Sequence, residues 1–474
     1  MRRAKANPYH EPSNSQFHRA TAMRDVTASS AGSSVPSTVA VSTLGAVFGG
    51  SIAALLVVGF TEMLKAMLAV VSRQNVWVLI LVPLLGLALS VLVLYRLGLS
   101  SEEQGLRRPK WAKWRTFPPD AARSHLTDDM VSSAGVEERF PWPLVPIRLL
   151  AICATVGFGC PMGTEAPAAY MGVATGAALG SRWRRLIRPA AVGGGAAGVA
   201  VLMGIPLVGT AYILELGRRH KAPLNVERVT AALVGGFVGW LLNIWLGVNL
   251  IRLVVPTEPP HSFYQALVTA LLIGGLSGSI TALSGAAIYR AKAWKASPII
   301  RLALGGLVLG ASALLISMIA SPEAAIGPGG GAISWVETAT GTAVLTVLAV
   351  DVLRAVATTA TAAAGGCGGL FVPFLAIGDL AGRVFAPSLK IPSDLAGAAG
   401  AAGGISGGYH LPFTAAVLVL SQGGPHLAVL TCLATVIVAA FVGTGSAKML
   451  DRILSLGRPS AAEKPIMEQD PYSF

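Results

Sequence analysis

Long runs of apolar residues, separated by short polar links, make up most of the chain after residue 40. The first two runs cover about 42–71 and 76–98, and each is long enough to cross a bilayer as a tilted helix. A third apolar helix is expected over about 229–248. Residues 1–40 are polar, rich in Ser, Ala and Arg, and hold three prolines, which predicts a disordered tail. The pattern predicts an all-α polytopic membrane protein.

Basic residues occur in alternate links between the apolar runs. The link from Arg96 to Arg139 is the longest, and it carries six further cations: Arg107, Arg108, Lys110, Lys113, Arg115 and Arg123. By contrast, residues 254–262 and 321–339 contain no Lys or Arg. Because cytoplasmic loops carry an excess of these residues, we expect the basic links and both termini to face the cytoplasm, with the chain in the plasma membrane.

Two glycine- and proline-bounded segments stand 206 positions apart. They are Gly163-Thr164-Glu165-Ala166-Pro167 and Gly369-Leu370-Phe371-Val372-Pro373, and the same offset relates further pairs: Arg148 and Arg354, Gly172 and Gly378, Gly176 and Gly382, Gly194 and Gly400, Gly198 and Gly404, Pro206 and Pro412. A single Gly-x-x-x-Pro segment is equally explained as a tight turn. A matched pair indicates an internal repeat, with a substrate site where the repeats meet.

The repeat divides the chain into four parts. A first membrane repeat covers residues 41–247 and a second covers 248–443, preceded by the tail and followed by a last short helix and a cytoplasmic tail over 444–474. Interrupted helices begin at both pentapeptides, and helix N-termini present unpaired N–H groups that suit an anion. A carboxylate inside an apolar region is rarely without function, so Glu165 is the first candidate for the ion pathway.

The two pentapeptides resemble the Gly-[Lys/Arg]-Glu-Gly-Pro and Gly-x-Phe-x-Pro signatures of the CLC chloride channels and chloride–proton antiporters. The resemblance covers roughly residues 41–455. It implies an inverted repeat of tilted, partly discontinuous helices and a homodimer with one anion pathway in each subunit. It also implies that Glu165 is the gate. Thr164 and Ala166 replace a cation and a glycine of the first signature, which indicates a divergent member.

The resemblance implies an anion site built from the two helix starts. Its backbone ligands are Gly163, Thr164, Ala166, Gly369, Leu370, Phe371 and Val372, with Pro167 and Pro373 in structural roles. Ser124 stands where the family has an anion-binding serine, although a helix cap explains it as well. The family also has a tyrosine ligand near the last helix. Residues 448–454 contain no tyrosine, so we expect the backbone N–H groups near Leu370 and Phe371 to supply that coordination.

Four ionisable residues flank these signatures. Arg148 and Arg354 each precede a signature centre by seventeen residues and are expected to attract anions, while Asp351 offers Arg354 an alternative ion pair three residues away. Glu215 matches a family carboxylate with an expected structural role. The next position, which carries the proton-transferring carboxylate in coupled members, is Leu216.

These features predict transport of chloride or a similar small anion. The leucine at position 216 favours a channel or a loosely coupled transporter; the alternatives are a chloride or fluoride antiporter that exchanges protons, and a membrane scaffold of the same fold without transport. About 20 residues follow the last predicted helix, so we expect no nucleotide-binding modules there.

Composition agrees with this assignment. Hydrophobic residues make up 53% of the chain and charged residues 12%, and the net charge of +13 lies in the links and not on a nucleic-acid-binding domain. The four cysteines have no metal-ligand spacing. Phosphate-loop, His-Glu-x-x-His and Gly-x-Ser-x-Gly motifs are absent, so we expect neither an enzyme nor a bound cofactor or metal.

Overall fold

A computed structural model describes residues 35–97, 122–219, 221–247, 262–294, 296–338, 343–422 and 430–456. Within these ranges the chain is helical, and ten helices are long and apolar enough to cross a membrane. The first repeat contains α2 (Val35–Ser72), α3 (Val76–Arg96), α4 (Leu126–Ser132), α5 (Val145–Ile152), α6 (Glu165–Gly180), α7 (Ile187–Met203), α8 (Pro206–Arg219) and α9 (Val226–Leu246). The prediction of an all-α polytopic membrane protein is confirmed.

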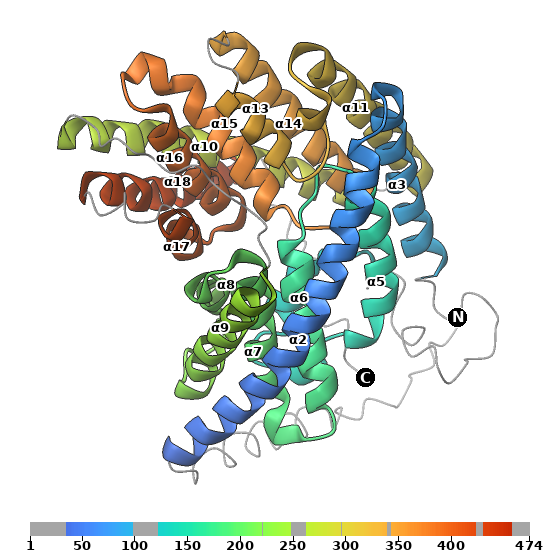
Figure 1. Ribbon diagram of the computed structural model, residues 1–474, viewed down its shortest axis with the longest axis vertical. Helices are drawn as coiled ribbons and strands as arrows, with labels where there is room; N and C mark the ends of the chain where they lie inside the picture. The colour runs from blue at the N-terminus through green and yellow to red at the C-terminus, as the bar shows by residue number, and fades with distance from the viewer. Residues whose placement is uncertain are drawn as a thin grey trace, which may run out of the picture.

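The second repeat follows in the same manner. It contains α10 (Phe263–Ala293), α11 (Pro298–Ile319), α12 (Pro322–Ala325), α13 (Gly330–Thr338), α14 (Val344–Ala364), α15 (Phe371–Leu389), α16 (Ser393–Tyr409), α17 (Pro412–Gln422) and α18 (Leu430–Leu456). In Figure 1 the helices α10 to α18 lie above α6 to α9, and α17 approaches α8 between them.

Two predicted boundaries differ from the observed helices. The first helix, α2, begins at Val35, so the last six residues assigned to the polar tail are helical. The last helix, α18, runs without interruption from Leu430 to Leu456, so no separate short helix begins at residue 444. Residues 1–34 of the tail and most of the 254–262 link lie outside the described residues.

Glycines at the repeated positions let helices approach closely in both halves. A Cβ atom added to Gly172 of α6 would overlap the carbonyl oxygen of Gly194 of α7, and one added to Gly378 of α15 would overlap that of Gly400 of α16. These two pairs are related by the sequence repeat. Small residues at such contacts allow backbone-to-backbone packing in membrane proteins. The repeat therefore corresponds to one packing unit, a helix pair, used twice.

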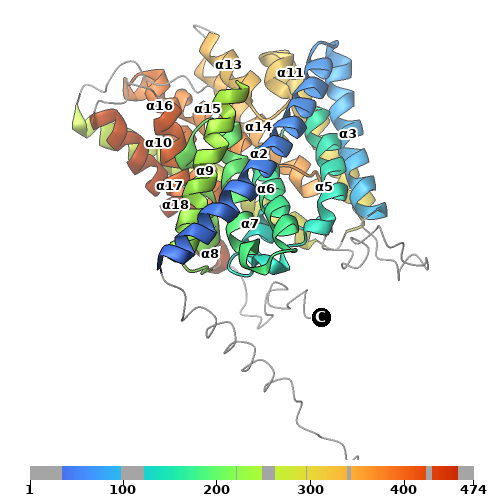
Figure 2. The same ribbon diagram turned by 60° about the horizontal axis from the view of Figure 1, so that its bottom comes forward.

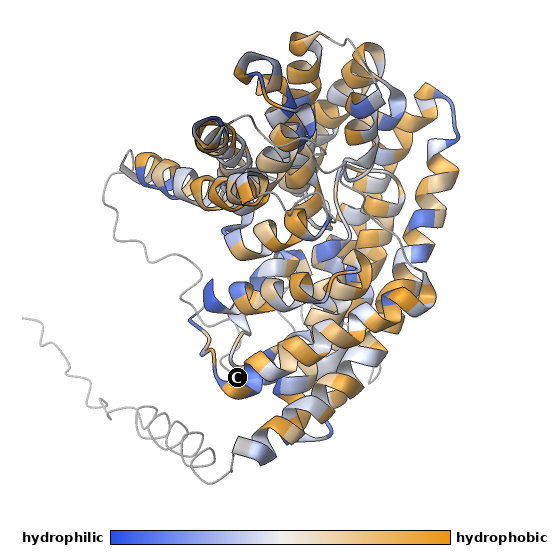
Figure 3. Cartoon of the chain, turned by 60° about the vertical axis from the view of Figure 1, so that its left-hand side comes forward, coloured by the Kyte–Doolittle hydropathy of each residue, from blue (hydrophilic) through white to orange (hydrophobic). Residues whose placement is uncertain are grey.

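The outer surface is apolar, as a lipid environment requires. Exposed side chains include Trp77 on α3, Trp245 on α9, Ile299 on α11 and Leu345 on α14. Figure 3 shows hydrophobic residues over most of the surface helices. In Figure 2 the first turns of α2 and helix α8 lie at one end of the molecule, while α13 and the connection between α2 and α3 lie at the other.

Candidate functional site

The two signature segments meet at the centre of the fold. The Gly163 N–H donates to the Gly369 carbonyl oxygen at 2.7 Å, and the Gly369 N–H donates to the Gly163 carbonyl oxygen at 2.8 Å. These bonds form an isolated antiparallel bridge between the repeats. Helix α6 begins two residues after Gly163 and α15 begins two residues after Gly369. The fold thus brings together two helix N-termini, whose N–H groups have no helical acceptors.

The Glu165 side chain occupies this junction. It is 3% exposed, and its Oε1 accepts a hydrogen bond from the Thr164 hydroxyl at 3.2 Å. Its Oε2 has no hydrogen-bond partner among the described residues and faces Gly163, where a Cβ atom would overlap it. The backbone of Val372, in the first turn of α15, is close enough to stabilise the carboxylate charge. Glu165 therefore belongs to one repeat and reaches the helix start of the other.

A tyrosine that the sequence analysis missed also reaches the start of α15. The Leu370 N–H donates to the Tyr409 hydroxyl oxygen at 2.9 Å. The Tyr409 ring packs edge-on against Phe371, with ring centroids 5.8 Å apart. The tyrosine ligand of the family was expected near the last helix, whereas Tyr409 is the final residue of α16. Tyr409 precedes the repeated Pro412 by three residues, and this position is the sequence feature that could have identified it.

A second tyrosine, Tyr212 of α8, lies on the other side of Phe371. The two ring centroids are 5.8 Å apart in an edge-on arrangement. The Tyr212 hydroxyl is buried, and no residue that the structure describes forms a hydrogen bond with it. Both Tyr212 and Tyr409 lie within electrostatic range of Glu165. The junction therefore holds two phenol groups beside the Glu165 carboxylate, although the sequence predicted none.

Ser124 and Arg148 belong to one buried network with Asp129, which the sequence analysis did not single out. The Ser124 hydroxyl donates to Asp129 Oδ1 at 2.9 Å and accepts from Arg148 Nη2 at 2.6 Å. Arg148 Nη1 forms an ion pair with Asp129 Oδ2, and the guanidinium lies 4.9 Å from the centre of the Tyr170 ring. Asp129 offsets the Arg148 charge that was expected to attract anions. Anion binding by Ser124 stays a prediction.

Arg354 does not form the ion pair with Asp351 that was offered as an alternative. Its guanidinium donates to the carbonyl oxygens of Ala324 at 3.0 Å and Gly327 at 2.9 Å. The last carbonyls of a short helix such as α12 lack helical donors, and a guanidinium supplies several N–H groups in a planar fork. Both carboxylate oxygens of Asp351 are buried and have no hydrogen-bond partner within the described ranges. Arg354 therefore fixes the segment between α12 and α13, and its expected action on anions stays a prediction.

Glu215 forms a further contact between the two repeats. Its carboxylate accepts hydrogen bonds from the backbone N–H groups of Phe413 at 3.0 Å and Thr414 at 2.7 Å, and from the Thr414 hydroxyl at 2.6 Å. These donors belong to the first turn of α17, so Glu215 caps a helix of the opposite repeat. The neighbouring Leu216 is buried among apolar residues. The geometry agrees with a structural role for Glu215.

Comparison with known proteins places the matches in one family of membrane transport proteins. Residues 110–444 match the model of the voltage gated chloride channel family. The chain is similar to the H(+)/Cl(-) exchange transporter ClcA of Yersinia pestis bv. Antiqua (strain Angola), with 24% identity over 385 residues that cover 75% of this chain and 77% of the relative. It is also similar to the H(+)/Cl(-) exchange transporter ClcA of Cronobacter sakazakii, with 25% identity over 351 residues that cover 69% and 73%.

Solved structures show the same fold. A crystal structure of a CLC-type fluoride/proton antiporter aligns with a TM-score of 0.64 at 21% identity, covering 88% of this chain and 96% of the other. A slow cyanobacterial Cl-/H+ antiporter aligns with a TM-score of 0.66 at 20% identity, covering 88% and 98%. With the matched helix starts, the bridge between them and the family match over most of the sequence, the chain belongs to the voltage-gated chloride channel (CLC) family.

Proposed function

We propose that the protein exchanges chloride or a similar small anion for protons across the membrane, with Glu165 as the gate. The observation that carries this proposal is the position of the Glu165 carboxylate, which is buried where the N-termini of α6 and α15 meet. A carboxylate and a small anion compete for such a place, because both are negative and both accept hydrogen bonds from the same N–H groups. Protonation removes the charge of Glu165 and weakens its hold, which frees the place for the anion.

The anion site proposed here uses the backbone of both signature segments. The ligands are the N–H groups around Phe371 and Val372 at the start of α15, together with those of Thr164 and Ala166 from the first repeat. The N–H groups of Gly163, Gly369 and Leu370, which the sequence analysis expected to bind the anion, donate to other groups of the protein and are not among these ligands. Tyr409 adds a hydroxyl group: its oxygen accepts from the Leu370 N–H, so its own hydrogen remains available to an anion. A hydroxyl donor binds an anion without fixing it too tightly for release.

Two observations bear on coupling to protons. Both solved structures reported above are antiporters and both curated relatives are exchange transporters, which supports exchange over the channel-like function expected from the sequence. Channel-like transport remains the second candidate, because Leu216 cannot carry a proton and Glu215 is held by three hydrogen bonds to α17.

One experiment distinguishes these functions. Purified protein in liposomes is given an outward chloride gradient, and proton movement against its own gradient is recorded, with fluoride and nitrate compared in parallel. Uphill proton movement supports exchange, while chloride efflux without it supports a channel. A protein that passes no anion under any condition contradicts both and supports a scaffold of the same fold.

The proposal also covers the oligomeric state of the protein and its orientation in the membrane. We infer a homodimer with one pathway per subunit, in the plasma membrane, with both chain ends in the cytoplasm. The basic links support this orientation. Cysteine-crosslinking of purified protein and labelling of tagged termini in intact cells test these two statements.

A further inference from the structure

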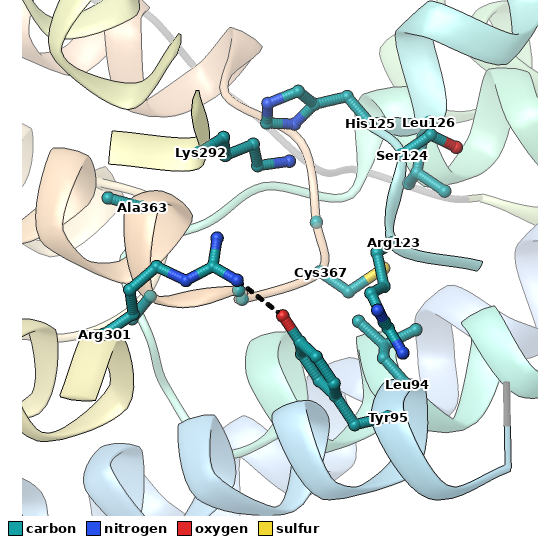
Figure 4. Close-up of a pocket in the computed structure, with 14 residues that line it drawn as sticks. Leu94, Tyr95, Arg123, Ser124, His125, Leu126, Lys292, Arg301, Ala363 and Cys367 are labelled. Carbon is teal, nitrogen blue, oxygen red and sulfur yellow. Dashed lines mark hydrogen bonds between the residues drawn. The ribbon is translucent and has the colours of Figure 1, made fainter. Parts of the chain in front are cut away.

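A cavity of about 340 Å³ opens beside the segment that leads into Gly369. Figure 4 shows its side chains: Arg123, His125, Lys292 and Arg301 surround Cys367, with Tyr95 at one edge. These residues come from the ends of α3, α10 and α14, the start of α11 and the segment before α4. We call this cavity the basic vestibule.

Three cations give the basic vestibule its charge. Tyr95 holds two of them: Arg301 Nη2 donates to the Tyr95 hydroxyl at 2.7 Å, and the Arg123 guanidinium lies 3.9 Å from the centre of the same ring. Lys292 is half-buried and forms no hydrogen bond or ion pair with any residue that the structure describes. The Arg301 charge also lies within electrostatic range of Lys292.

Among the residues that the structure describes, few negative groups lie near Lys292. Within the described ranges, the exposed Asp128 is the one carboxylate that acts electrostatically on Lys292. Burial lowers the pKa of His125 to about 3, so its imidazole is neutral at physiological pH. The buried Arg148 also acts on Lys292 with its positive charge, although the ion pair with Asp129 offsets part of that charge. Counted over its described lining residues, the basic vestibule is therefore a partly enclosed space with a net positive charge.

The size of the space indicates what it binds. One water needs about 10–15 Å³ of such volume, and pockets for small molecules start at about 300 Å³. A single chloride ion fills only a small part of the basic vestibule and meets one or two of its cations. A phosphate group carries about −1.5 to −2 charges at neutral pH and several acceptor oxygens, which match cations converging from different helices.

We propose that the basic vestibule binds a multivalent oxyanion with one or two phosphate groups, and that the bound oxyanion blocks transport. The second part rests on the proposed function. Gly368 lines the cavity, and the next residue, Gly369, is bonded to Gly163 at the anion site. An oxyanion held by Lys292 and Arg301 therefore closes the route between this side of the molecule and the site. Its multiple charges oppose its own passage, because the proposed anion site offers mainly neutral N–H donors.

Binding is tested without any transport measurement. Pyrophosphate is titrated into the purified full-length protein by calorimetry in detergent, for the wild type and for Lys292→Gln, Arg301→Gln and the matched control Lys390→Gln, an exposed lysine at the end of α15. We expect at least tenfold weaker binding in the first two variants, unchanged binding in the control, and weaker binding at high salt. Equal affinity in Lys292→Gln, or no binding to the wild type at millimolar pyrophosphate, overturns the proposal.

Additional ligands in the same binding experiment identify the source of the phosphate, and an additional variant controls for misfolding. Inorganic phosphate, a nucleoside triphosphate and an inositol phosphate are compared with pyrophosphate, so that a free anion and a lipid headgroup are distinguished by relative affinity. Arg301→Lys keeps the charge and is expected to retain most of the binding. If Arg301→Lys binds as weakly as Arg301→Gln while both elute as folded protein, loss of the Tyr95 contact and not of charge explains the effect, and the electrostatic argument is wrong.

Block is tested separately in liposomes. Pyrophosphate on the side of the basic vestibule is expected to reduce chloride flux in the wild type and in Lys390→Gln, and to have at least tenfold less effect in Lys292→Gln. Binding without any reduction of flux overturns the second part of the proposal. Absence of flux in the untreated wild type contradicts the proposed function instead, and leaves the calorimetric result to stand by itself.

Discussion

Replacing Glu165 by glutamine removes the charge of the proposed gate and keeps its shape. The amide still accepts the Thr164 hydroxyl bond at Oε1, so the local structure is preserved. What changes is the attraction between the side chain and the helix starts. We expect anion flux to increase at neutral and alkaline pH, because the side chain no longer competes strongly for the N–H groups of α15.

The size of this effect follows from the contacts of Glu165. A hydrogen bond to a charged group contributes about 1.5–3 kcal/mol and a neutral one about 0.5–1.5 kcal/mol, so each affected bond weakens by about 1 kcal/mol. A negative charge at a partly buried helix N-terminus contributes up to about 2 kcal/mol. Together these give about 2–3 kcal/mol in favour of the open form. At a pH where the charged Glu165 keeps the wild-type gate closed, the ratio of open to closed form is therefore expected to rise by a factor of roughly 30 to 150.

The assay is chloride efflux from liposomes at a series of external pH values. Wild-type flux is expected to rise as the external pH falls, because protons neutralise Glu165. Flux through Glu165→Gln is expected to be high and nearly independent of pH, and proton movement is expected to be lost, because an amide carries no exchangeable acid. If the variant keeps the full pH response of the wild type, Glu165 is not the gate.

Three other substitutions test the surroundings of the site. Tyr409→Phe leaves the Leu370 N–H without its acceptor, at a cost of about 1–3 kcal/mol, and is expected to change the ratio of fluoride to chloride flux; an unchanged ratio excludes Tyr409 as a ligand. Asp129→Asn leaves the buried Arg148 charge uncompensated and is expected to lower stability by about 3–5 kcal/mol, measured by thermal unfolding; an unchanged midpoint contradicts the ion pair. Pro373→Ala loosens the start of α15 and is expected to alter anion selectivity; identical selectivity in a folded variant counts against a site there.

The sequence by itself determined the class of protein and the plan of the fold. Apolar runs of bilayer length predict transmembrane helices because every backbone polar group must be satisfied inside its own segment. The offset of 206 positions predicts two helix starts facing one site, and the Gly163–Gly369 bridge joins those starts. Such features are local, since they depend on residue types within one segment and on the comparison of two segments.

The tertiary structure decided which side chains complete the junction. Tyr212 and Tyr409 are 197 positions apart and meet around Phe371, and Asp129 reaches Arg148 from a separate helix. Arg354 binds carbonyl oxygens and not the aspartate three residues away, because the end of a short helix in another segment supplies acceptors that the sequence does not reveal. Contacts of this kind depend on how helices distant in sequence pack against each other. The sequence shows which polar residues are present, and only the packing determines which of them are in contact.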